Sequence, residues 1–120
     1  MSDGWIGVDL DGTLAEYSGW TGDPFEIGKP VPKMVERVKY WLRNGEQVWI
    51  VTARVNFESR IDATPELIQQ TREAIDNWCL RYIGMVLPVT YKKNHSMVEL
   101  WDDRVVQVIP NTGERADGKA

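Results

Sequence analysis

Short runs of apolar residues alternate along the chain with longer stretches in which apolar residues recur every three or four positions. The short runs predict buried strands, and the longer stretches predict amphipathic helices. Strands are predicted at 5–8, 48–51, 85–89 and 98–101, with a fifth at 105–109, and helices at 32–43 and 65–82. Strands that alternate with helices favour an α/β domain with a mainly parallel sheet.

The two predicted helices have recognisable ends. Pro32 suits the first turn of the first helix, and Asn44-Gly45 is a typical stop. Thr64 is suited to the N-cap of the second helix, with Pro65 at its first position. These signals fix where each helix begins and where the first one ends.

The chain has 120 residues, which is enough for one domain. Residues 14–30 mix aromatic side chains with Gly, Pro and polar residues, and we expect them to form a flap or long loop. Residues 111–120 are polar and contain glycine, which predicts a tail that frays. We therefore expect a single catalytic domain over 1–110, followed by this tail.

The net charge of −4 gives the chain no general attraction to nucleic acid or anionic lipid. A single cysteine, Cys79, excludes an intrachain disulfide and predicts a small buried side chain. No apolar run approaches the roughly 20 residues of a membrane span, and the N-terminus lacks a signal-peptide pattern. We expect a cytoplasmic protein with no membrane partner, and the oligomeric state is left open.

Candidate chemistry begins where the first predicted strand ends, in Asp9-Leu10-Asp11-Gly12-Thr13. Gly12 permits a turn that lets both carboxylates face one site, and backbone N–H groups in such a turn can bind an anion. Two carboxylates suit Mg²⁺, and without a cation they would repel a phosphate. One carboxylate can attack phosphorus while the other acts as general acid and base. The alternative is an ordinary polar turn.

Other polar residues follow later strands. Thr52 and Arg54 come after the second strand, and Asp102-Asp103 end the fourth. Ligands of parallel sheets bind beyond the carboxyl ends of the strands, so these residues are expected to converge with Asp9. Thr52 and Arg54 are suited to phosphate oxygens, and the acidic pair to Mg²⁺. The alternatives are a strand-end threonine, a surface ion pair and an acidic loop paired with a neighbouring arginine.

Two lysines precede the fourth strand. An ammonium from Lys92 or Lys93 can neutralise the nucleophile and the transferring phosphoryl group, although a solvated pair is the alternative. His95 is the only histidine and has no partner pattern for a triad or a zinc site. We expect it to be non-catalytic.

Taken in order, these residues resemble the four motifs of the haloacid dehalogenase-like (HAD) superfamily of phosphotransferases. Residues 9–13 resemble the first motif, Asp-x-Asp-Gly-Thr, and Thr52 resembles the second. Lys93, with Lys92 as its rival, resembles the third motif, and residues 102–103 resemble the fourth. The resemblance covers nearly the whole chain.

The resemblance implies a Rossmann-like three-layer sandwich of the small, capless type and an Mg²⁺-dependent phosphatase. Asp9 would be the nucleophile, Asp11 the general acid and base, and Lys93 the catalytic cation. The implied metal ligands are Asp9, the backbone carbonyl of Asp11, and Asp102 with or without Asp103. The implied phosphate-binding residues are Leu10, Gly12, Thr13 and Thr52.

A nearer, partial likeness is to the phosphatase half of phage-type polynucleotide kinase/phosphatases, carried by Thr52-Ala53-Arg54 and residues 102–108. It implies that Arg54 binds the substrate phosphate and that a nucleotide or nucleic-acid end is a substrate class. With no room for a full cap, the substrate is either large or covered by the flap or another subunit.

Aromatic side chains in the flap leave two interpretations open. Tyr17, Trp20 and Phe25 can stack on a base or ring of the substrate, or they can pack the flap onto the domain. We favour packing.

Two alternative functions also stay open. One is a HAD enzyme with another phosphotransfer or a C–X cleavage, although an acid at Asp11 favours phosphate esters. The other is a non-catalytic Mg²⁺-binding or regulatory α/β module. Such modules also place an acidic cluster, a threonine and a lysine at strand ends, but their acidic pair comes early in the chain, whereas here it comes late.

Overall fold

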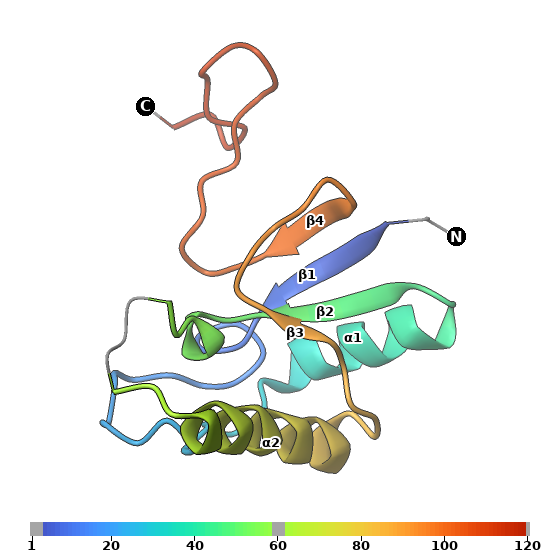
Figure 1. The fold of residues 1–120 in the computed structure, drawn as a ribbon. Helices are drawn as coiled ribbons and strands as arrows, with labels where there is room; N and C mark the ends of the chain where they lie inside the picture. Colours follow the sequence, from blue (N-terminus) through green and yellow to red (C-terminus); the bar gives the residue numbers. More distant parts are fainter. Residues whose placement is uncertain (1–3, 59–61, 120) are drawn as a thin grey trace.

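The fold is that of a computed structural model, which describes residues 4–58 and 62–119. Its elements are β1 (Trp5–Asp9), α1 (Pro32–Arg43), β2 (Gln47–Val51), the 3₁₀ turn η1 (Ala53–Val55), α2 (Pro65–Tyr82), β3 (Val89–Thr90) and β4 (Met97–Trp101). The strands form one parallel sheet in the order β3-β2-β1-β4 (Figure 1). The predicted Rossmann-like α/β fold is confirmed. The outer limits of the predicted domain and tail, residues 1 and 120, lie outside the described residues.

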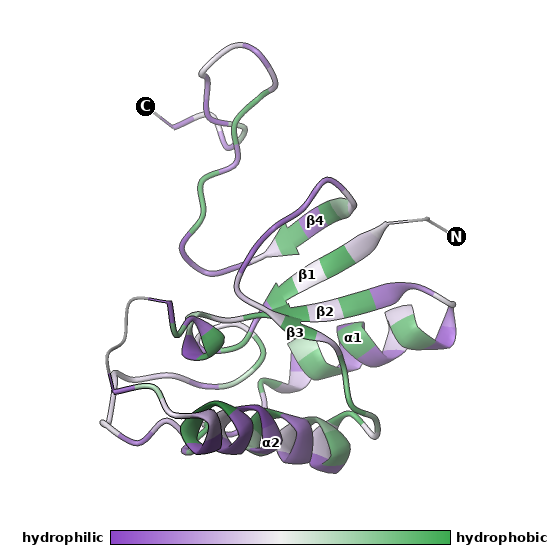
Figure 2. Cartoon of the chain, in the orientation of Figure 1, coloured by the Kyte–Doolittle hydropathy of each residue, from purple (hydrophilic) through white to green (hydrophobic). Residues whose placement is uncertain are grey.

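The hydrophobic core lies between one face of the sheet and the two helices. Ile6 and Val8 of β1 and Ile50 of β2 point to this face, because side chains alternate along a strand. They pack with Val38 of α1 and Ile75 of α2, and each of the five is at most 4% exposed. Both helices lie on the same side of the sheet, and their hydrophobic positions are coloured green in Figure 2. The strands β1, β2 and β3 follow one another toward the same edge of the sheet. Because both crossovers between them are right-handed, the two helices lie on the same face.

The helices begin where the sequence predicts. Pro32 and Pro65 occupy first-turn positions, and Thr64 Oγ1 accepts a hydrogen bond from Leu67 N at 3.1 Å. The chain leaves α1 through Gly45, whose φ of 80° suits a residue without Cβ. Within the described residues, no helix is both long and apolar enough to cross a membrane.

The opposite face of the sheet is covered by the connection between β3 and β4, residues 91–96. Asn94 Oδ1 accepts a hydrogen bond from Trp5 Nε1 at 3.0 Å, and Ser96 O accepts one from Trp5 N at 2.9 Å. The Trp5 ring stacks on Trp49 with their centroids 4.6 Å apart. A right-handed return from β3 past β1 to β4 must cross this face. The third layer is therefore this short connection instead of a helix.

The third strand is shorter than predicted. Residues 85–89 were expected to form it, but β3 comprises only Val89 and Thr90. Gly84 turns the chain at a φ of 100°, and Pro88 has no N–H to donate to a ladder. Pro88 instead offers its carbonyl to Ile50 N at 2.8 Å.

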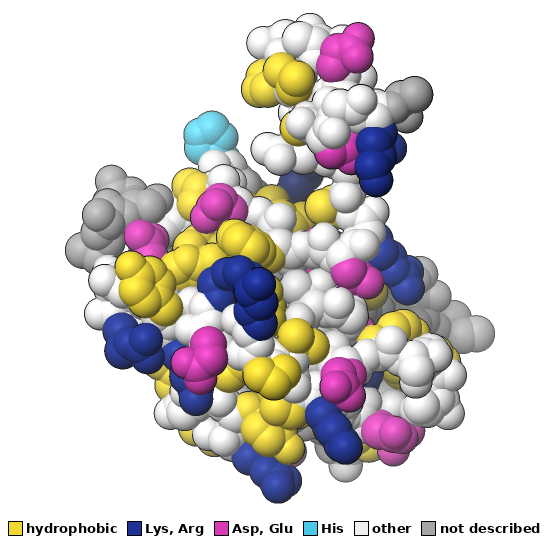
Figure 3. All heavy atoms as spheres, turned by 180° about the vertical axis from the view of Figure 1, so that it is seen from behind, with side chains coloured by type: hydrophobic (Ala, Val, Ile, Leu, Met, Phe, Trp, Pro, Cys, Tyr) yellow, Lys and Arg dark blue, Asp and Glu magenta, His cyan; other side chains and the backbone are white. Residues whose placement is uncertain are grey.

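The predicted fifth strand is wrong. Residues 105–109 pair with no strand of the sheet, and only an isolated bridge joins Val108 to Arg115. The segment projects from the body of the protein (Figures 1 and 3), and Val105 and Val106 are about half exposed, at 52% and 51%. The following residues, where fraying was expected, fold back so that Ala116 N donates to Gln107 O at 2.9 Å.

Candidate active site

A cleft of about 460 Å³ opens where β1, β2 and β4 end. Its lining residues are Asp9, Asp11, Tyr17, Trp20, Pro24, Val51, Thr52, Ala53, Arg54, Asp102 and Arg104. The structure thus brings together five of the predicted site residues, which are Asp9, Asp11, Thr52, Arg54 and Asp102. The convergence follows from the parallel sheet, because the carboxyl ends of its strands meet at one edge.

A tight turn after β1 presents the two aspartates. Leu10 O accepts hydrogen bonds from Leu14 N at 3.0 Å and Ala15 N at 2.8 Å, which reverses the chain directly after the strand. Gly12 lies at a φ of 89°, and a Cβ there would sit 2.5 Å from Asp103 Oδ2. Glycine is therefore required both by the backbone conformation and by the close approach of Asp103.

Three carboxylates form an acidic cluster beside this turn. One oxygen each of Asp9, Asp102 and Asp103 lies within 4.8 Å of the others. Burial, followed by the charge of Asp102 and the contact with Asp103, raises the pKa of Asp9 to about 7, whereas the Thr13 hydroxyl opposes the shift. Crowded anionic oxygens of this kind fit a hard divalent cation, which would relieve their repulsion. These residues could hold a metal ion.

The acidic cluster predicts a stability change with pH in the metal-free protein. The pKa of Asp9 is raised from 3.8 to about 7 in the fold, so the stability present at low pH is lost as the pH rises through this window. Because Asp9 is only partly buried, we expect a loss of about 1–2 kcal/mol between pH 5 and pH 8. Thermal unfolding in EDTA measures it.

Two controls isolate the cause of that loss. The Asp9→Asn variant should lose less stability than the native chain over the same pH range, and saturating Mg²⁺ should restore the native chain at pH 8. Equal pH dependence in the native chain and the variant, with no effect of Mg²⁺, would show that the cluster neither stores this repulsion nor binds the ion.

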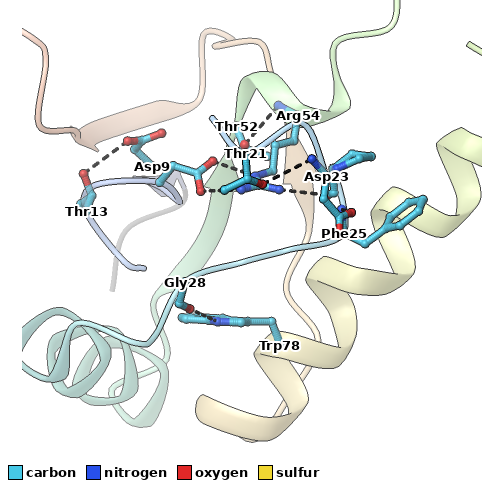
Figure 4. A network of polar contacts seen from close by, with 11 residues as sticks. Asp9, Thr13, Thr21, Asp23, Phe25, Gly28, Thr52, Arg54 and Trp78 are labelled. Atoms are coloured by element: carbon cyan, nitrogen blue, oxygen red, sulfur yellow. Dashed lines mark hydrogen bonds and ion pairs between the residues drawn. The ribbon is translucent and has the colours of Figure 1, made fainter. Parts of the chain in front are cut away.

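Arg54 holds Asp11 by a two-pronged ion pair. Its Nε and Nη2 donate to the two carboxylate oxygens of Asp11 at 2.8 and 2.9 Å, and its side chain is only 6% exposed. A third bond, from Arg54 Nη1 to Pro24 O at 2.9 Å, ties the guanidinium to the flap (Figure 4). Both carboxylate oxygens of Asp11 thus accept bonds from Arg54, and a role for the Asp11 carbonyl oxygen as a metal ligand stays a prediction.

Thr52 lies at the cleft floor and is 3% exposed. Its hydroxyl oxygen accepts a hydrogen bond from Arg54 N at 3.2 Å, so the hydroxyl proton remains for a ligand. Its backbone N–H donates to Thr90 O at 2.8 Å. Because the β2–β3 pairing uses this N–H, the hydroxyl is the donor of Thr52 that a phosphate oxygen could meet.

Three of the predicted phosphate-binding residues, Leu10, Gly12 and Thr13, do not line the cleft. Leu10 is fully buried in the core, and Gly12 N donates to Ala15 O at 2.8 Å. Thr13 Oγ1 donates to Asp9 Oδ2 at 3.3 Å (Figure 4), so its contact is with the predicted nucleophile. A role for these three residues in phosphate binding stays a prediction.

The two lysines lie on the segment that crosses the far face of the sheet. Lys92 Nζ pairs with Glu58 Oε1 at 3.2 Å, and Tyr91 donates a very short hydrogen bond to the same oxygen. Lys93 is exposed and, like Lys92, is not among the residues that line the cleft. The cations of the lining are Arg54 and Arg104, and a catalytic role for Lys93 stays a prediction.

One charged residue of the cleft carried no functional role in the sequence. Arg104 appeared only as the basic neighbour of the acidic pair, yet no ion pair joins it to Asp102 or Asp103 within the described residues, and it lines the cleft. Its position directly after the acidic pair was the signal that could have found it. Tyr17 and Trp20, which the sequence named for stacking or packing with packing favoured, also line the cleft.

Known proteins that resemble this chain give information on its fold. No family model matches the chain, and no curated protein gives a significant match. Among solved structures, the chain is similar to a conserved protein from Bacteroides thetaiotaomicron, with a TM-score of 0.54 and 24% sequence identity. The similarity covers 90% of this chain and 82% of the other. At this identity the likeness supports the α/β fold alone.

Proposed function

We propose that this chain is an Mg²⁺-dependent phosphatase of the HAD type, which hydrolyses a phosphomonoester through an aspartyl-phosphate on Asp9. One observation carries the proposal. Asp9 and Asp11 flank the same turn and line the same cleft as Thr52 and Arg54. Asp9 also belongs to the acidic cluster, in which its oxygen and those of Asp102 and Asp103 lie within 4.8 Å of one another. This arrangement supplies a nucleophile, an acid, a phosphate-binding cation and a candidate metal site in one place.

The proposed reaction has two steps. In the first, a carboxylate oxygen of Asp9 attacks phosphorus, and the bond from phosphorus to the leaving oxygen breaks as that oxygen takes a proton from Asp11. In the second, water attacks phosphorus and gives a proton to Asp11. The bond between phosphorus and Asp9 then breaks, which releases inorganic phosphate and restores both aspartates.

The acidic cluster is the proposed Mg²⁺ site. Asp9, Asp102 and Asp103 would hold the ion together with the backbone carbonyl of Asp11. When bound, the ion would neutralise phosphoryl oxygens and so permit the approach of an anionic nucleophile. The Thr52 hydroxyl and Arg54 would bind and orient the remaining phosphoryl oxygens. A cytoplasmic location and a phosphorylated substrate, such as a nucleotide or a nucleic-acid end, belong to the same proposal.

Phosphate release from a substrate panel tests the proposal. The panel contains p-nitrophenyl phosphate, nucleotides, sugar phosphates and 3′-phosphorylated oligonucleotides, each assayed with Mg²⁺ and with EDTA. We expect release that requires Mg²⁺. Folded protein that binds Mg²⁺ without releasing phosphate from any substrate would instead indicate a binding or regulatory module.

The choice of cation gives a further prediction. Because Arg54 lines the cleft and Lys93 does not, Arg54→Met should lower kcat/KM by about 100-fold, the scale of losing one charge-stabilising donor, whereas Lys93→Met should lower it much less. Steady-state kinetics on the best substrate measures both, with Lys92→Met as a matched control. A larger loss in Lys93→Met than in Arg54→Met would restore Lys93 as the main catalytic cation.

A further inference from the structure

One wall of the cleft is aromatic and comes from the flap. Tyr17, Trp20 and Pro24 line it, whereas the floor carries Asp9, Thr52 and the other polar groups. The volume of about 460 Å³ falls in the range of pockets that hold whole small molecules. A phosphoryl group fills only part of such a space, so the remainder is available to the rest of the substrate.

The two aromatic rings are more exposed than the residues that anchor the flap. Trp20 is 56% exposed and Tyr17 is 38% exposed, whereas Leu14 and Ala15 at the start of the flap are fully buried. The far end is tied down by Trp78, whose Nε1 donates to Gly28 O at 2.9 Å (Figure 4). The sequence analysis favoured packing over stacking for Trp20, but the most deeply buried flap residues are Leu14 and Ala15 and Trp20 is more than half exposed.

The aromatic wall is held in place before any ligand arrives. Arg54 Nη1 binds Pro24 O at 2.9 Å, and the Arg54 guanidinium carbon lies 5.3 Å from the centroid of the Trp20 ring. The residue proposed to bind the phosphoryl group is therefore also the one that contacts the flap aromatic. The phosphate-binding cation and the flap aromatic are therefore neighbours, as a substrate with a phosphate at one end and a ring at the other requires.

We infer that the cleft takes phosphomonoesters whose leaving group carries a planar heteroaromatic ring, as in a nucleoside phosphate, with the ring stacked on Trp20 and Tyr17. This inference rests on the proposed phosphatase function and adds the residues that would recognise the ring of its substrate. Stacking on an aromatic face tolerates any base, since every base has a π-face. We therefore expect selection for a ring over no ring, with little preference among bases.

Matched substrates separate ring recognition from phosphate chemistry. Adenosine 5′- and 3′-monophosphate are compared with the 5- and 3-phosphates of methyl ribofuranoside, which have the same leaving alcohols but no base. We expect kcat/KM to be higher for the nucleotides by between about 5-fold and 150-fold, the range that stacking of one base provides. A 3′-phosphorylated oligonucleotide, assayed beside them, distinguishes a free nucleotide from a nucleic-acid end as the better source of the ring.

Variants locate the ring-binding site. Trp20→Leu should lower kcat/KM for the nucleotides much more than for the base-free phosphates and so remove most of the preference, and Trp20→Phe should keep most of it. Phe25→Leu is the matched control, because Phe25 is a flap aromatic of similar exposure, 42%, that does not line the cleft. Equal activity on both substrate classes in the native chain would overturn the inference and leave the phosphatase standing.

Binding separates a failed inference from a failed phosphatase. If no substrate is hydrolysed, the proposed function fails, and calorimetric titration of the native chain with the same matched compounds still tests the ring site. Tighter binding of adenosine monophosphate that Trp20→Leu abolishes would support the ring site. Equal affinities for the two compounds would overturn it.

Discussion

Replacing Asp9 with Asn is expected to abolish phosphate release, with a fall in kcat of about 10⁴-fold or more, the scale of losing a nucleophile. The fold should survive, because the amide has nearly the same shape and its oxygen can still accept the 3.3 Å hydrogen bond from Thr13. An amide oxygen cannot form the acyl phosphate. Relief of the repulsion from Asp102 and Asp103 should leave the metal-free variant at least as stable as the native chain at pH 8.

A trapped intermediate makes this test specific. After rapid acid quench with labelled substrate, the native chain should carry a phosphoryl group that hydroxylamine removes, and Asp9→Asn should carry none. Asp117→Asn is a suitable control, because Asp117 pairs with Arg115 at 2.8 Å in the C-terminal segment and does not line the cleft. Near-native turnover in Asp9→Asn would exclude the covalent route.

The positions of Asp9, Thr52 and Asp102 could be predicted from the sequence because each comes directly after an apolar strand. The apolar run that marks a strand can be recognised from neighbouring residues alone, and parallel strands always place their carboxyl ends at one edge of the sheet. Neither inference requires knowledge of how the side chains pack. Helix ends were predictable for a similar reason. Pro65 and its cap Thr64 act through hydrogen bonds within a single turn.

The hydrogen-bond partners of Arg54 could not be predicted in this way. Asp11 reaches Arg54 because the ends of β1 and β2 meet, and Pro24 reaches it through residues 14–30, which show no periodicity in the sequence. The bonds from Arg54 to Pro24 O and from Trp78 to Gly28 O span 30 and 50 residues. No signal within the flap itself specifies such partners.

The predicted fifth strand shows the opposite error. Residues 105–109 have the β-branched composition of a strand, but a strand also needs a neighbour with which to pair. After Asp102 accepts a hydrogen bond from Arg104 N at 2.8 Å, the chain turns away from the sheet. The β-branched composition correctly indicated residues that favour extended backbone, but it carried no information on the turn that directs them away from the sheet.

Replacing Asp11 with Asn is expected to lower kcat by about 10²–10⁴-fold on alkyl phosphates, because an amide cannot supply the proton that an alkoxide leaving group needs. The loss should be much smaller on p-nitrophenyl phosphate, whose phenolate leaves without a proton. The ratio of the two kcat values, native against Asp11→Asn, measures the acid role independently of any general damage to the site. Equal losses on both substrates would mean that the proton given to the leaving group does not limit turnover, and that Asp11 acts as the base of the second step or positions Arg54.

The ion pair gives that experiment a second outcome. Both oxygens of Asp11 accept hydrogen bonds from Arg54, so Asp11 can protonate a leaving group only after Arg54 frees one of them and that oxygen takes up a proton from solvent. A substrate phosphate competes for the same guanidinium, and its arrival would transfer Arg54 from Asp11 to the phosphoryl oxygens. Asp11→Asn should weaken this competitor and bind inorganic phosphate more tightly than the native chain. Weaker binding in the variant would contradict the exchange, and calorimetric titration with phosphate measures it.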